Sequence, residues 1–164
     1  MDALLAVVGL LAVLHVLYST WTARRLDRLH ARVDAATAAL DRQLRYRAEA
    51  ALAFAPAARG SAGRDLAAAA TAALAVSGLG HDREAAESAV SRALQSAHAD
   101  VDGALADVMT RAVFARRFHN DAVRDALTVR KRRIVRWFHL AGTARLPSFF
   151  EMDEATPERR TIEV

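Results

Sequence analysis

The chain contains no cysteine, only 7 glycines and 3 prolines among 164 residues, and few aromatic side chains. Without cysteine there can be no disulfide framework, thiolate metal site or cysteine nucleophile. The scarcity of glycine and proline leaves few helix breakers. Lys131 is the only lysine, so arginine supplies nearly all of the positive charge behind the formal net charge of +4.

The remaining composition favours helix. Hydrophobic residues make up 53% of the chain, and alanine accounts for much of this fraction. Alanine-rich helix faces pack closely but bury little area each. We therefore predict an all-α protein with a thin core, built as an antiparallel bundle of about four helices, two of them long. No segment alternates with the period of a β-strand.

The first part of the chain is an uncharged apolar run. No formal charge lies between Asp2 and Arg24, and a helix of this length reaches about 30 Å, the thickness of a bilayer core. Tyr18 and Trp21 stand at the end of the run, as interfacial aromatic residues do. We predict a transmembrane anchor over residues 1–23. A signal peptide and a buried core helix are the alternatives.

The charges around this run predict its orientation. Arg24, Arg25, Arg28 and Arg32 follow the run directly, whereas only the amino terminus and Asp2 precede it. The positive-inside rule then places the N-terminus outside the cell membrane and the rest of the chain in the cytoplasm.

Residues 24–151 are predicted to form the helical bundle. The first helix should continue to about Ala55, where Pro56 ends or kinks it, because one apolar stripe extends beyond the anchor. This stripe comprises Leu26, Leu29, Val33, Thr37, Leu40, Leu44 and Ala48. A loop over 57–63 and a short helix over 64–76 should follow.

Glycines and charges punctuate the second half of the chain. Gly78 and Gly80 suit a left-handed helix end, and Asp82 is a plausible N-cap of a third helix. The last helix is expected over 104–141, with Gly142 as its stop signal. We predict that residues 152–164 form a disordered tail.

The last helix has polar residues within its apolar stripe. At helical spacing Met109, Val113, Arg116, Asn120, Val123, Leu127, Ile134 and Phe138 share one face. Arg116 and Asn120 therefore need partners across the bundle or a place at its wet end, and Arg47 falls in the same layer. Candidate carboxylate partners are Asp34, Asp41, Glu49 and Asp121. The layer either fixes helix register or binds an anionic group.

Two further surfaces have open interpretations. Phe114 and Phe118 point away from the stripe and are either covered by another helix or form a partner surface. The basic run of Arg130, Lys131, Arg132, Arg133 and Arg136 is a solvated face, a contact for anionic lipid or, least in agreement with the sequence, a nucleic-acid site.

The sequence indicates no catalytic or cofactor chemistry. No acid–base pair or nucleophile has a spacing typical of catalysis. The histidines form no HExxH pair, so we expect no metal ligands. The sequence predicts a protein that is not an enzyme and has no cofactor. Its expected partners are the lipid bilayer and other membrane proteins, and nucleic acid is not expected. The oligomeric state stays open.

Three stretches resemble the LemA family of bacterial membrane proteins. Residues 40–47 are similar to the family's helix that ends in an arginine, here Arg47. Residues 115–124 resemble its Ala-Arg-Arg-aromatic-Tyr-Asn-x-x-Val signature, with His119 in place of the tyrosine. Phe149, Phe150 and Glu151 resemble the Phe-Phe-Glu that closes the family domain. The resemblance implies one N-terminal span, a cytoplasmic bundle of long helices, and a scaffold or adaptor beside other membrane proteins, including membrane proteases.

Overall fold

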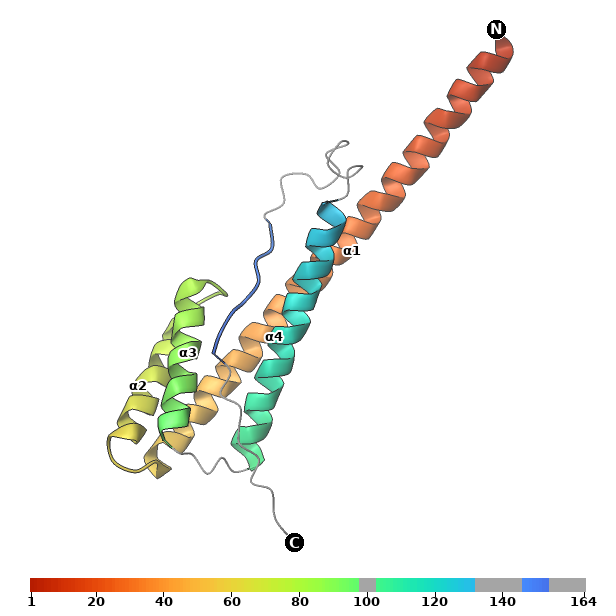
Figure 1. The fold of residues 1–164 in the computed structure, drawn as a ribbon. Helices are drawn as coiled ribbons and strands as arrows, with labels where there is room; N and C mark the ends of the chain where they lie inside the picture. The colour runs from red at the N-terminus through yellow and green to blue at the C-terminus, as the bar shows by residue number, and fades with distance from the viewer. Residues whose placement is uncertain (98–102, 132–145, 154–164) are drawn as a thin grey trace. The chain divides into compact units, whose positions relative to one another are not determined.

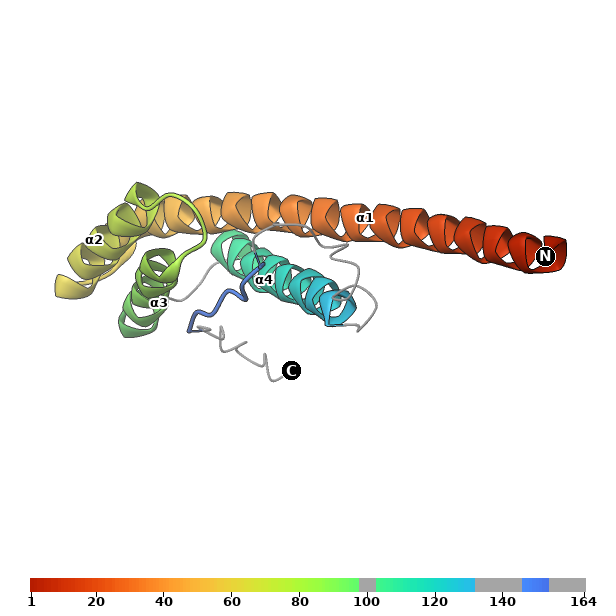
Figure 2. The same cartoon turned by 90° about the horizontal axis from the view of Figure 1, so that it is seen from above.

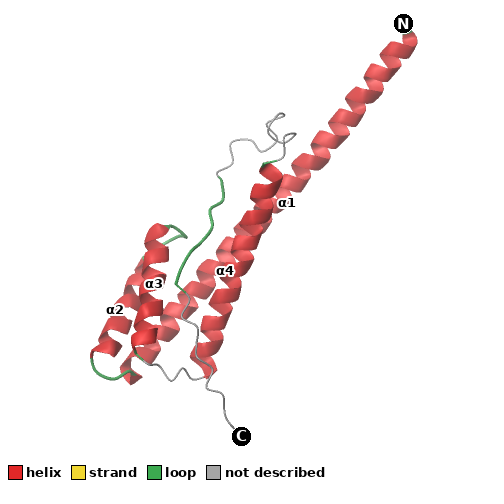
Figure 3. Ribbon diagram, viewed as in Figure 1, coloured by secondary structure: helices red, strands yellow, loops and turns green. Residues whose placement is uncertain are grey.

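The computed structural model describes residues 1–97, 103–131 and 146–153, and all regular structure in these ranges is helical. The elements in chain order are α1 (Asp2–Phe54), the 3₁₀ helix η1 (Ala55–Ala57), α2 (Ser61–Ala75), α3 (His81–Ser96) and α4 (Gly103–Arg130) (Figure 1). Figure 3 shows helices and loops, with no strand in the described residues. The prediction of an all-α protein with two long helices is confirmed.

The chain divides into two compact units. Unit 1 comprises Met1–Ala35 and Asp121–Ser148, and unit 2 comprises Ala36–Asn120 and Phe149–Val164. The helices α1 and α4 contribute to both units, whereas α2 and α3 belong to unit 2 alone.

The core of unit 2 is rich in alanine. The helix α2 lies beside α3 in both views (Figures 1 and 2), and both contribute to one apolar cluster with the end of α1 and the start of α4. The buried members of this cluster are Ala48, Ala51, Ala55, Leu66, Ala70, Ala73, Val90, Leu94, Leu105 and Met109. The small side chains allow the helices to approach closely, as a thin core requires.

Within unit 2, α1 and α4 run antiparallel. Unit 2 contains α1 from Ala36 onward and α4 up to Asn120. Thr37, at the start of the first stretch, contacts His119, at the end of the second. Further along α1, Leu40 and Leu44 share a second apolar cluster with Ala112. Helix propensity and the apolar stripe explain this arrangement, because the predicted stripe residues from Leu26 to Ala48 are buried or half-buried.

The link between α1 and α2 is tighter than predicted. Pro56 lies at the start of η1, which continues the chain for three residues after α1. Gly60 takes a positive φ of 68°, and α2 already begins at Ser61, so the loop predicted over 57–63 is too long. At Gly63 a β-carbon would lie 2.5 Å from the backbone oxygen of Ala55, so this turn requires glycine.

Two predictions about the α2–α3 connection are wrong in detail. Gly78 adopts a left-handed conformation, with a φ of 80°, but it does not cap α2, whose C-cap is Val76 in an extended conformation. The N-cap of α3 is Gly80 rather than Asp82, and it has no side-chain cap. Asp82 and Glu84 lie instead in the first turn, where their charges favour the helix dipole. The N-cap prediction for Asp82 was wrong because α3 begins two residues earlier than an N-cap at that position requires.

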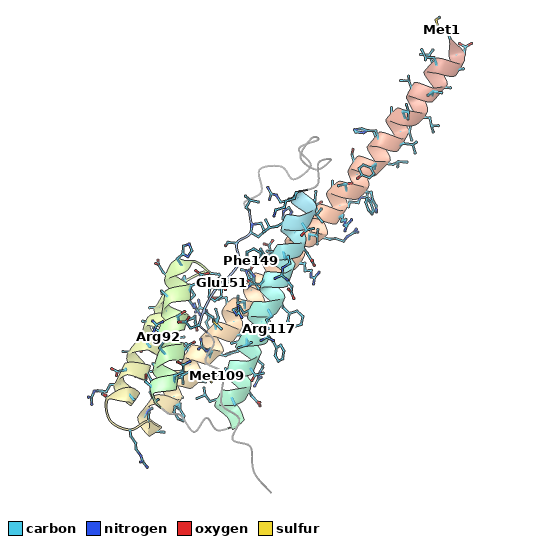
Figure 4. All side chains as sticks on the ribbon, in the orientation of Figure 1. Met1, Arg92, Met109, Arg117, Phe149 and Glu151 are labelled. Carbon is cyan, nitrogen blue, oxygen red and sulfur yellow. The ribbon has the colours of Figure 1, made fainter. Side chains whose placement is uncertain are left out.

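Unit 1 contains the apolar N-terminal part of α1. Its large apolar side chains are all exposed and project from the helix on every side (Figure 4). This stretch is long and apolar enough to cross a membrane, and none of its most apolar 18 residues is buried. A helix buried in the core of this chain, one of the two alternatives, does not agree with that exposure.

In the rest of unit 1, apolar residues of α1 and α4 are buried. Leu26 and Val129 are buried together, with Leu29 packed beside them, and Arg32 pairs with Asp125 at 3.0 Å. α4 is described to Arg130, so its predicted continuation to residue 141, the stop at Gly142 and most of the tail lie outside the described residues.

Candidate functional site

A buried charged cluster joins α1 to α3 within unit 2. Its members are Arg47 from α1 and Arg83, Glu87 and Ser91 from α3. The carboxylate of Glu87, which is fully buried, accepts from Nη1 of Arg47 at 2.8 Å through Oε2 and from Nε of Arg83 at 2.9 Å through Oε1. One buried carboxylate is therefore shared by two guanidinium groups.

Further partners contact the two guanidinium groups, whereas Nη2 of Arg83 is buried without a hydrogen-bond partner among the described residues. Nη1 of Arg83 donates to the backbone oxygen of Val76 at 2.8 Å, and the half-buried carboxylate of Asp41 lies 3.5 Å from the same nitrogen. Nη2 of Arg47 donates to the hydroxyl of Ser91 at 2.6 Å. Burial lowers the pKa of Arg47 and the nearby charge of Glu87 opposes this shift, so the ion pair keeps the guanidinium charged in the core.

The carboxylates that the sequence suggested for the polar layer do not include the partner of Arg47. None of Asp34, Asp41, Glu49 and Asp121 pairs with Arg47 in the described contacts, and Glu87 takes that place. A sequence signal for the cluster did exist. Residues 83, 87 and 91 recur every fourth position, and this spacing puts them on the same face of α3 as the buried Val90 and Leu94.

A non-helical segment, residues 149–153, lies across α3 and α4 within unit 2. Its burial alternates, since Phe150 is 1% exposed and Met152 is half-buried, whereas Phe149, Glu151 and Asp153 are exposed. Phe150 packs with Leu40, Leu44 and Ala112. Figure 4 labels Phe149 and Glu151, the two outward residues that flank it. We call this stretch the docked segment.

The side chain of Asn120 holds the docked segment to α4. Its Oδ1 accepts from the backbone N–H of Phe150 at 2.9 Å, and its Nδ2 donates to the backbone oxygen of Phe150 at 3.1 Å. The amide thus satisfies both backbone groups of one residue, as a neighbouring strand would. Arg116 lies 3.9 Å from the carboxylate of Glu151.

Side chains of α3 hold the remainder of the docked segment. Glu84 accepts from the backbone N–H of Glu151 at 2.8 Å, and Ser88 accepts from that of Asp153 at 3.1 Å. Ser91 donates to the backbone oxygen of Asp153 at 2.6 Å. Ser91 therefore connects the docked segment directly to Arg47 in the charged cluster.

The predicted polar layer corresponds in part to this arrangement. Arg47, Arg116 and Asn120 all lie in unit 2, but Arg47 bonds to α3 whereas Arg116 and Asn120 contact the docked segment. An anionic ligand at Arg47 would have to displace Glu87. The buried line of α4 in unit 2 runs through Leu105, Met109, Ala112 and His119, so the predicted stripe is rotated, with Val113 only half-buried.

The other predicted surfaces differ in how far they are described. Phe114 and Phe118 are 52% and 67% exposed, so no described element of unit 2 covers them, and their role as a partner surface stays a prediction. Arg130 is half-buried and Lys131 is exposed, whereas Arg132, Arg133 and Arg136 lie outside the described residues. Among the described residues no group of three potential metal ligands comes together.

No family model, curated protein or solved structure matches the chain. The function is therefore inferred from the residues and their geometry.

Proposed function

We propose that the chain is a membrane-anchored scaffold or adaptor whose helical part lies in the cytoplasm. The observation that carries this proposal is the exposure of the apolar N-terminal part of α1. Its most apolar 18 residues have a mean hydropathy of 2.1, and none of them is buried. Exposed apolar surface of this extent is costly in water and favourable in lipid.

The polar groups near the end of the run agree with a bilayer setting. The hydroxyls of Thr20 and Thr22 donate to the backbone oxygens of Leu17 and Tyr18, both at 2.9 Å, so neither needs water as a partner. Trp21 lies between these two threonines, and the guanidinium of Arg25 lies 5.8 Å from its ring centroid. An aromatic residue beside a cation is typical of the level of lipid headgroups.

The charge asymmetry supports the proposed orientation of the span. Arg24, Arg25 and Arg28 follow the run within two helical turns, whereas Asp2 precedes it. We infer a single-pass protein of the cell membrane with its N-terminus outside.

The scaffold role is supported by the surface of the bundle and by the family resemblance. Phe114 and Phe118 are one turn apart on α4 and exposed, which suits contact with a membrane neighbour. The resemblance of residues 40–47, 115–124 and 149–151 to the LemA family favours work beside other membrane proteins. We propose no reaction for the chain.

Deletion of residues 1–23 tests the proposal. We expect a water-soluble product with the helix content of the bundle, because the core clusters of unit 2 involve none of these residues. The full chain with Leu10→Ala serves as a matched control that should stay in the membrane. A deletion product that still requires detergent would contradict the proposal, as would one that loses its helical circular dichroism.

A further inference from the structure

The docked segment is bound as a peptide ligand is bound. All of its backbone hydrogen bonds in the described structure run to side chains of α3 and α4, and none involves a helix backbone group. Its release therefore breaks no hydrogen bond of any helical ladder. We call the side chains that receive it the groove: Glu84, Ser88 and Ser91 of α3, Asn120 of α4, and the apolar Leu40, Leu44 and Ala112 around Phe150. These helices also pack against one another in the alanine-rich cluster.

The groove is selective for a particular pattern. One large apolar side chain enters at Phe150, and a second apolar side chain two residues later lies against the cluster, where Nη1 of Arg47 is 4.0 Å from the sulfur of Met152. An acidic residue follows, since Asp153 pairs with Arg92 of α3 at 3.0 Å. Alternate side chains give the specificity and the backbone hydrogen bonds give a general hold, as in the recognition of extended peptides.

We propose that this groove exchanges its occupant between copies, so that residues 149–153 of a second copy of this chain dock where the chain's own segment docks. A second copy carries the one segment known to fit the groove. Each hydrogen bond and ion pair that is broken within a chain is therefore formed again between the two copies. The inference rests on the proposed function in one respect, because a shared membrane concentrates copies and thereby favours exchange.

A charge swap between Arg92 and Asp153 tests the exchange without disturbing the core. Both side chains are about three-fifths exposed, at 61% and 62%, so neither substitution threatens the fold. In a chain with Arg92→Asp the groove repels its own segment, and in a chain with Asp153→Arg the segment meets its own Arg92. When the two variants are mixed, the segment with Asp153→Arg can dock beside the Arg92→Asp position of the other copy, which joins opposite charges. Exchange in the other direction pairs the unsubstituted Asp153 with the unsubstituted Arg92.

The readout is energy transfer between labelled full-length copies in detergent micelles at low ionic strength. We expect the mixture to associate roughly two- to thirtyfold more strongly than either variant alone, since exposed ion pairs replace like-charge contacts. A chain that carries both substitutions is the control, because its own ion pair is restored, and it should behave like the unsubstituted chain. A mixture no more associated than the single variants overturns the proposal.

A second measurement separates the possible occupants. A fluorescent peptide of residues 146–153 is titrated into the full chain with Phe150→Ala, and into the same chain with Asn120→Ala added. Binding that requires Asn120, together with association of the charge-swap pair, supports exchange between copies. Peptide binding without association of copies assigns the groove to a different protein and overturns the proposal, as does the absence of peptide binding. Micelles are used throughout, so failure here is distinct from failure of membrane anchoring.

Discussion

Replacement of Glu87 by glutamine should destabilise unit 2 strongly. The substitution preserves shape but removes the only fully buried carboxylate in the cluster, which leaves the guanidinium groups of Arg47 and Arg83 without their shared counter-charge. Asp41 cannot compensate, because it lies 3.5 Å from Arg83 and is partly exposed. Loss of one member of a buried ion pair costs about 3–5 kcal/mol.

The direction of the charge imbalance makes the prediction specific. Arg47→Met removes one of the two cations and leaves Glu87 paired with Arg83, so the cost should be smaller, about 1–3 kcal/mol. We therefore expect Glu87→Gln to be clearly more harmful than Arg47→Met, although both break the same 2.8 Å ion pair.

Thermal unfolding of the full chain in micelles, followed by far-ultraviolet circular dichroism, measures this order. Glu87→Gln should lower the Tm by about 6–20 °C, because each kcal/mol shifts it by about 2–4 °C. Glu49→Gln makes the same chemical change at an exposed position of α1 and should leave the Tm within about 2 °C. An equal effect of Glu87→Gln and Glu49→Gln would refute the account of the cluster, and so would a larger effect of Arg47→Met.

Further substitutions test the docked segment and the close approach of η1 to the start of α2. Phe150→Ala should cost about 3–5 kcal/mol because it empties a core position, whereas Phe149→Ala, at an exposed neighbour, should cost under about 1 kcal/mol; denaturant unfolding compares the two, and equal losses would contradict the docking. Asn120→Ala should cost about 1–3 kcal/mol, because it leaves both backbone groups of Phe150 without their partner; Asn120→Asp keeps the acceptor for the N–H of Phe150 but sets a second acceptor against its backbone oxygen, so it should not restore the lost stability. Gly63→Ala should lower the Tm through the clash with Ala55, whereas Gly103→Ala meets nothing within 4 Å; no difference between the two would contradict the close approach of η1 and α2.

Much of the fold could be predicted because it depends on local and periodic signals. The stripe from Leu26 to Ala48, the proline at residue 56 and the glycines near residue 78 each have a meaning that requires no knowledge of distant contacts. They located α1, α2 and α3 to within a few residues. The start of α2 was predicted less accurately because Gly63 was interpreted as a loop residue. It lies instead in the first turn of α2, where the absence of a side chain lets the helix approach the backbone of Ala55.

The site was harder to predict because its partners are distant in sequence. Arg47 and Glu87 are 40 residues apart, and Asn120 and Phe150 are 30 apart. Periodicity says which side chains share a face but not which faces meet, so Asp41 and Glu49 were as plausible as Glu87. Asn120 and Phe150 were both identified from the sequence, but not as partners. The amide of Asn120 bonds to the backbone of residue 150, and every residue type has the same backbone groups, so the sequence at position 150 does not indicate this contact.

The measurement that tests the central claim most directly is membrane fractionation of cells that express the full chain, with a high-salt wash followed by a carbonate wash. An integral span resists both treatments, so we predict that the chain stays in the pellet after each wash. Release by salt would indicate a surface contact through charge, and release by carbonate would indicate a peripheral attachment. Either release would contradict an anchor formed by the apolar part of α1.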